Sequence, residues 1–158
     1  MKNFLSLCLI VVFLSGVFLL VTNKKTAQNI APQHIQYVAI NKALIKVDVV
    51  ITAEDQEKGL GGRESLGKNE GMLFVFATPD KHFFWMKDMK FAIDMVWLDE
   101  FGRIIYIEKN ATPASYPELF GPKKSSKYVL EIPAGFSDIQ NIQVGDKAEF
   151  LSITPTNK

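Results

Sequence analysis

The stretch HFFWMKDMKFAIDMVWLD, residues 82–99, packs aromatic and methionine residues around a few isolated charges and decides the expected fold. Side chains of a strand alternate between its two faces, so Asp94 would share one face with Val96 and Leu98. Apart from Asp94, both faces of such a strand are apolar, which is typical of a core. The stretch therefore predicts two consecutive core strands joined through residues 87–90, and the Asp94 carboxylate needs a cation or backbone donors.

Short β-prone runs separated by turn residues make up most of the chain beyond residue 70. They are residues 71–76, 82–87, 93–99, 103–109, 127–132 and 147–153. Because no long helical pattern lies between them, parallel crossover units are not expected. The sequence predicts a compact, mainly β (α+β) domain with a mostly antiparallel or barrel-like sheet and one or two short helices.

Turn and cap residues place the smaller elements. An Asn-Lys pair at residues 41–42 interrupts two apolar runs and indicates a tight hairpin turn or a bend. Thr52, with Asp55 three residues later, resembles a capping box and predicts a short helix over residues 53–60. A similar pattern at Ser137 predicts one further helical turn.

Glycine-rich and proline-rich segments predict loops. Residues 59–71 contain five glycines, yet they follow a helix and lack a Gly-Lys-Ser/Thr signature, so sharp turns are favoured over a phosphate-binding loop. Residues 110–124 contain three prolines and predict a long surface loop, where binding functions often reside.

An uncharged apolar run at the N-terminus predicts a membrane segment. Residues 4–21 form eighteen such residues, about 27 Å of helix against a hydrocarbon core of about 30 Å. We expect a signal anchor or transmembrane helix over residues 1–22, a polar tether over 23–33 and a single globular β-rich domain over 34–158. A cleaved signal peptide is the alternative. The charges that flank the run, Lys2 with the terminal amine against Lys24 and Lys25, are nearly balanced, and we expect an anchored domain on the extracytoplasmic side, in the cell envelope.

Composition excludes several classes of protein. Without Lys2, Lys24 and Lys25, the chain beyond the tether has 15 of the 18 basic residues against all 17 acidic ones, so its formal charge is −2 and no nucleic-acid partner is expected. Cys8 is the only cysteine and lies in the apolar run, so no thiol nucleophile or thiolate metal site is expected in the domain. With two histidines, a metal site is not expected either, and no cofactor is implied.

The order of motifs resembles an uncharacterised family, the domain of unknown function 192. EKGLGGRESLGKNEGMLFVF, FFWMKDMKFAIDMVWLDEFGRI, YVLEIPAG and VGDKAEF carry the resemblance, which covers about residues 57–150. It implies a compact β domain, often exported or membrane-tethered, and no established activity. Gly61 and the pair Asp88-Met89 depart from the family pattern, which commonly has Met and Asn-Thr there. The family-like residues are Gly59, Leu60, Arg63, Leu66, Gly71, Met72, Leu73, Phe74, Phe76, Trp85, Met86, Asp94, Glu131 and Gly135.

Five of these residues form the hypothetical ligand site: Arg63, Trp85, Met86, Asp94 and Glu131. In one interpretation Asp94 pairs with Arg63 or with nearby amides and is purely structural. In the other, Arg63 binds a carboxylate or phosphate of a ligand while Asp94 or Glu131 orients it. Trp85 is either a core residue or an exposed stacking platform beside Lys87.

Three functions remain open at this level. The first is a membrane-tethered extracytoplasmic binding or accessory domain for a small molecule, glycan or peptide, with a pocket near Arg63, Trp85 and Asp94 and with residues 4–21 in the membrane. The second is a hydrolase that acts on an envelope polymer through Asp94 and Glu131, or through His82. The third is a purely structural module. No nucleophile motif is present, so no catalytic residue is assigned and a non-enzymatic function is favoured.

Overall fold

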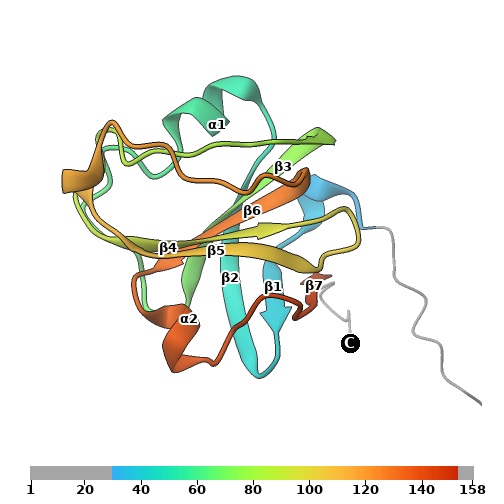
Figure 1. The fold of residues 1–158 in the computed structure, drawn as a ribbon. Helices are drawn as coiled ribbons and strands as arrows, with labels where there is room; N and C mark the ends of the chain where they lie inside the picture. Colours follow the sequence, from blue (N-terminus) through green and yellow to red (C-terminus); the bar gives the residue numbers. More distant parts are fainter. Residues whose placement is uncertain (1–29, 153–158) are drawn as a thin grey trace, which may run out of the picture.

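Residues 30–152 are described by the computed structural model, and they form a curled sheet with two short helices (Figure 1). The helices α1 (Ala53–Lys58) and α2 (Phe136–Ile139) lie at opposite ends of the sheet, and 3-10 turns span Pro32–His34 (η1) and Pro113–Ser115 (η2). The mainly β prediction with one or two short helices is confirmed. The strands are β1 (Tyr37–Ile40), β2 (Ala43–Val50), β3 (Glu70–Asp80), β4 (Ile93–Leu98), β5 (Ile104–Ala111), β6 (Ser126–Pro133) and β7 (Ala148–Leu151).

The sheet curls into a half-barrel. Hydrogen-bonded neighbours follow the order β5-β4-β6-β3-β2-β1-β7, and all pairs are antiparallel except β2 with β3. Two hydrogen bonds join the ends of the outer strands, β5 and β7. The Ile104 amide donates to the Asp146 carbonyl at 2.9 Å, and the Ala148 amide donates to the Gly102 carbonyl at 2.8 Å. These bonds satisfy backbone groups that a flat sheet would leave unpaired at its edges.

The parallel pair of β2 and β3 corrects one expectation. The chain leaves β2, forms α1 and returns to β3 in the same direction, so a crossover unit exists where none was expected. The Thr52 side chain caps α1 as predicted, since its Oγ1 accepts the Asp55 amide at 3.2 Å. The predicted tight hairpin is also present, with Asn41 in a left-handed conformation between β1 and β2.

Two apolar clusters cover the two faces of the sheet. The first fills the inside of the half-barrel and includes Ile45, Leu73 and Leu130. The second lies on the other face of β3, β4 and β6, where Phe74 and Trp97 pack beneath residues that are not in strands. Both faces of β4 are buried, and the predicted alternation along residues 93–98 is confirmed.

Residues 82–87 do not form the predicted strand. A single bridge joins Phe84 to Phe120, and the segment crosses over β4 without pairing along it. The physical reason is that β5 and β6 already occupy both edges of β4. We call residues 81–90 the arm.

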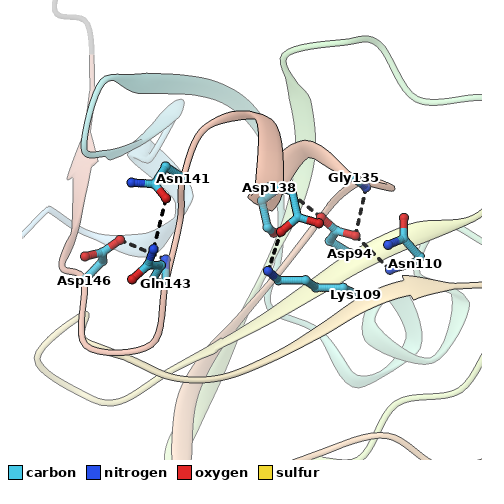
Figure 2. A network of polar contacts seen from close by, with 9 residues as sticks. Asp94, Lys109, Asn110, Gly135, Asp138, Asn141, Gln143 and Asp146 are labelled. Carbon is cyan, nitrogen blue, oxygen red and sulfur yellow. Dashed lines mark hydrogen bonds and ion pairs between the residues drawn. The ribbon is translucent and has the colours of Figure 1, made fainter.

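Asp94 is fully buried and is held by backbone amides, while Arg63 pairs with Asp48. Figure 2 shows the Asp94 carboxylate between the backbones of Asn110 and Gly135. Its Oδ1 accepts the Asn110 amide at 2.9 Å and the Gly135 amide at 3.0 Å, and its Oδ2 accepts the Ser137 amide at 2.9 Å. The proposed ion pair with Arg63 is therefore wrong, whereas the expectation of backbone donors is confirmed. One carboxylate joins β4 to the end of β5 and to the start of α2.

The start of α2 also differs from its prediction, because Asp94 accepts backbone amides there. Gly135, in a left-handed conformation, is the N-cap, and no side chain caps the helix. Ser137 is the second residue of α2, and its amide donates to Asp94, so the Ser137 capping box does not form.

The expected membrane segment lies outside the described residues, as does the tether up to residue 29. Within residues 30–152 no helix is long and apolar enough to span a bilayer.

Replacing Asp94 tests its role in the fold. Asp94→Asn presents an NH₂ group where backbone amides point, so it should lower the free energy of unfolding by about 3 kcal/mol or more. Urea denaturation followed by circular dichroism measures this. Asp138→Asn removes an exposed carboxylate of α2 that pairs with Lys109 of β5, and it should cost less than about 1 kcal/mol. Equal effects of the two substitutions would contradict the assignment.

Candidate functional site

The arm and α1 enclose a cleft on the second face of the sheet, which we call the arm cleft. Its volume is about 340 Å³, within the range of roughly 300 to 1,000 Å³ that is common for small-molecule sites. The glycine-rich turn that follows α1 contacts the arm at two points. The Gly62 amide donates to the Asp88 carbonyl at 2.9 Å, and Lys90 pairs with Glu64. The cleft is therefore bounded by a helix, a glycine turn and the arm.

Aromatic rings line much of the arm cleft. Phe74 and Phe84 meet edge to face with ring centroids 4.7 Å apart, and His82 stacks on Phe76 at 3.4 Å. The Trp97 indole donates to the His82 carbonyl at 2.8 Å and so fixes the first part of the arm on the sheet. The aromatic residues that line the cleft are Phe74, Phe76, His82, Phe83, Phe84 and Trp85.

Glu131 supplies a carboxyl group to this apolar surface. It lies on β6 between its register partners Met72 and Met95, and it is 5% exposed. Its Oε2 has no hydrogen-bond partner among residues 30–152. Burial, opposed by the positive charge of Arg63, raises the pKa of Glu131 to about 8.

His82 supplies a second unpartnered polar atom. Its Nε2 is buried and has no partner in the described part of the chain, whereas the ring bonds to the backbone of Thr78. Burial lowers the pKa of His82, against the opposing effects of the Thr78 backbone and of Asp80. Because a bond to a backbone carbonyl uses the N–H of the other ring nitrogen, Nε2 carries a lone pair that no described residue satisfies.

Lysines surround the mouth of the arm cleft. Lys58, Lys81 and Lys87 are exposed lining residues, and Glu57 is the acidic one beside them. The Lys87 ammonium lies 5.6 Å from the centre of the Trp85 ring. The mouth is therefore positively charged, while the interior carries a carboxyl group.

The structure separates the five predicted site residues. Trp85 and Glu131 line the arm cleft, whereas Met86 is buried in the second apolar cluster. Trp85 is 42% exposed and meets Tyr116 edge to face, so the exposed position considered for it is the one observed.

Arg63 lies at a separate, smaller cavity of about 50 Å³. Its guanidinium pairs with Asp48 at 2.9 Å. Arg63 and Trp85 therefore do not line one concavity, and the pocket expected near Arg63, Trp85 and Asp94 does not form as such.

Asp94 and Glu131 lie on opposite faces of the sheet. Glu131 is the register partner of Met95, and Asp94 is the partner of Ile132 on the other face. The paired-carboxylate arrangement that a glycan-cleaving site requires is not formed by these two residues.

No metal site is evident in the described chain. Among residues 30–152, no group of three or more His, Cys, Asp or Glu side chains could hold an ion.

His82 and the lysines of the mouth were not predicted as ligand-binding residues. His82 was considered only as a general base, because its stacking on Phe76 and its free Nε2 depend on the path of the arm. Two of the departures from the family pattern, Gly61 and Met89, also line the cleft. Asp88, the third, has φ of +57°, a conformation that Asn and Asp tolerate better than most residues.

A family model matches residues 36–150, which is most of the chain. The model is that of DUF192, described as "Uncharacterized ACR". The chain belongs to this family. The DUF192 resemblance seen in the sequence is thereby confirmed, and the match covers every strand except the last residue of β7.

Individual relatives agree with the family. A UPF0127 protein of Pyrococcus abyssi is 28% identical over 92 residues, which cover 54% of this chain and 73% of the relative. A crystal structure of a protein of unknown function from Novosphingobium aromaticivorans matches with a TM-score of 0.69 and 29% identity, over 73% of this chain and 84% of that one. A Sinorhizobium meliloti structure named as a candidate transcription regulator matches with a TM-score of 0.69 and 28% identity, over 72% and 92%.

The raised pKa of Glu131 predicts a pH dependence of stability. The folded protein holds a proton on Glu131 up to about pH 8, whereas the unfolded chain releases it near 4.5. The stabilising contribution of the protonated group is thus complete below pH 4.5 and is lost as the pH rises to about 8, by a sum on the order of 4 kcal/mol.

The Glu131→Gln variant should lack this loss, and urea denaturation from pH 4 to 9 measures the difference. Its stability should rise relative to the wild type across the same pH range. The exposed Glu149→Gln variant controls for the removal of one negative charge. Parallel pH profiles for the wild type and Glu131→Gln would contradict the assignment.

Proposed function

We propose that the protein is a membrane-tethered binding domain that holds a small ligand in the arm cleft on the extracytoplasmic side. Three buried side-chain atoms have no hydrogen-bond partner among residues 30–152: Glu131 Oε2, His82 Nε2 and Ser137 Oγ. The observation that carries this proposal is that two of them, those of Glu131 and His82, belong to residues that line one cleft. Buried polar atoms in folded proteins nearly always have partners. A ligand that donates hydrogen bonds would satisfy both atoms.

The rest of the cleft supports binding over structural support alone. Trp85 and Phe83 remain exposed beside the mouth, and such aromatic rings provide stacking area for a ligand. A purely structural module would use Arg63 to neutralise Glu131, but the Arg63 guanidinium is paired with Asp48.

The hydrolase alternative has less support. Asp94 is saturated by backbone amides on the opposite face of the sheet. Of the described residues that line the arm cleft, none is Ser, Thr or Cys, so an acyl-transfer nucleophile is missing from it.

The location proposed for the domain rests on the sequence. Residues 4–21 are uncharged and long enough to cross most of a bilayer, and this segment would hold the domain at the envelope. Protease added to intact cells should digest the domain if it lies outside the cytoplasm. Digestion that occurs only after lysis would refute the proposed location. It would not bear on ligand binding in the arm cleft.

Ligand capture tests the binding function. The full-length chain, purified in mild detergent and incubated with the small-molecule fraction of an envelope extract, should retain a ligand that native mass spectrometry detects. Trp85→Ala should reduce the retained fraction at least fivefold, because it removes stacking area worth about 1 kcal/mol or more.

Phe101→Ala is the matched control, since Phe101 is 73% exposed on a turn that does not line the cleft. Retention that is unchanged in Trp85→Ala, or absent from the wild type, would overturn the proposal.

A further inference from the structure

The interior of the arm cleft and its mouth carry opposite electrostatic character. Inside, Glu131 is a carboxyl group without a partner among the described residues, and it lies between Met72 and Met95. Outside, Lys58, Lys81 and Lys87 outnumber Glu57. A ligand that fits both regions has a positive end and a negative end.

We infer that the ligand of the arm cleft is a small zwitterion: a primary ammonium group enters between the aromatic rings and pairs with Glu131, and an anionic group meets the lysines of the mouth. This inference rests on the proposed binding function and specifies its ligand class.

The aromatic rings favour an ammonium group over a neutral donor. Phe74, Phe76 and Phe84 line the cleft beside Glu131, and the faces of aromatic rings attract cations. A neutral hydroxyl group could donate one hydrogen bond to the Glu131 carboxyl, but it would leave the ionised form without a counter-charge. An ammonium group supplies the counter-charge that burial otherwise denies.

The lysines and arginines of residues 30–152 do not pair with Glu131. The positive charge of Arg63 opposes the effect of burial on the pKa of Glu131, but the Arg63 guanidinium forms its ion pair with Asp48 at the smaller cavity. The lysines are exposed at the mouth, where Lys87 lies over Trp85. No Lys or Arg of residues 30–152 forms an ion pair with Glu131, so the inferred counter-charge comes from the ligand.

His82 favours a primary over a quaternary ammonium group. His82 lines the cleft, its Nε2 has a lone pair without a partner among the described residues, and the ring bonds to the Thr78 backbone. A primary ammonium group has three N–H donors, which can serve Glu131 and also His82. A quaternary ammonium group has none.

The two tryptophans of the chain make the inference measurable. Trp85 lines the cleft, and the Trp97 indole donates to the His82 carbonyl, so both indole N–H signals report on the site. The probes are glycylglycine and O-phosphoethanolamine, which share an ammonium group near an anionic group. They differ in that anion, so the tighter binder identifies a carboxylate or a phosphate as the group that the lysines prefer.

The experiment titrates each probe into the ¹⁵N-labelled full-length chain in detergent micelles at pH 7. At least one probe should shift the Trp85 indole signal, and its N-acetylated analogue, which lacks the ammonium charge, should bind at least tenfold more weakly. Glu131→Gln should weaken binding of the amine at least tenfold. The exposed Glu118→Gln, which does not line the cleft, should leave it unchanged.

If the wild-type protein binds a probe and its acetylated analogue equally well, the inference is overturned. This comparison does not depend on whether Glu131→Gln folds. If neither probe binds while an envelope ligand is still retained with dependence on Trp85, the ligand class is wrong and the proposed function stands. If no envelope ligand is retained either, both fail.

Discussion

The carboxylate of Asp94 is the interaction on which the rest of the structure depends. It accepts three backbone amides that lie 16, 41 and 43 residues further along the chain. A buried carboxylate with all its partners on the backbone fixes the positions of β4, β5 and α2 together, since losing any one donor leaves charge uncompensated in the core. The central strand β4 is thereby held in one register.

That register determines the opposite face of β4. With Asp94 turned toward the inside of the half-barrel, Met95 and Trp97 turn toward the second cluster. The Trp97 indole then reaches the His82 carbonyl and anchors the arm, and the arm covers β3 and β6 to form the cleft. The cleft that we propose as a binding site is in this sense a consequence of how one aspartate is satisfied.

The two buried carboxyl groups of the sheet show how structural and functional polar residues differ. Asp94 has its hydrogen-bond acceptors filled by the fold. Glu131, on the adjacent strand and the opposite face, has an oxygen that the described chain leaves without a donor. A buried carboxyl group without a partner lowers the stability of the fold. Binding of a ligand to Glu131 would explain why the group is present.

Local rules predicted the parts of this structure that depend on neighbouring residues. Alternation along residues 93–98 and the Thr52 cap were predicted because both operate within a few residues. The error about residues 82–87 arose because β propensity does not reveal whether a strand edge is free. The Arg63 error arose because backbone amides, which hold Asp94, are invisible to an argument from side-chain charge. Glu131 was predicted as a site residue, but its missing partner depends on three strands that are distant in sequence.

The central claim is that the arm cleft contains a buried carboxyl group that residues 30–152 leave without a partner. A ¹³C NMR titration of the Glu131 side-chain carboxyl in the ligand-free protein tests it most directly, with Glu131→Gln to assign the signal. The account predicts a pKa of about 8. A pKa near 4.5, the value of an unperturbed glutamate, would show that Glu131 is solvated or paired and would contradict the account.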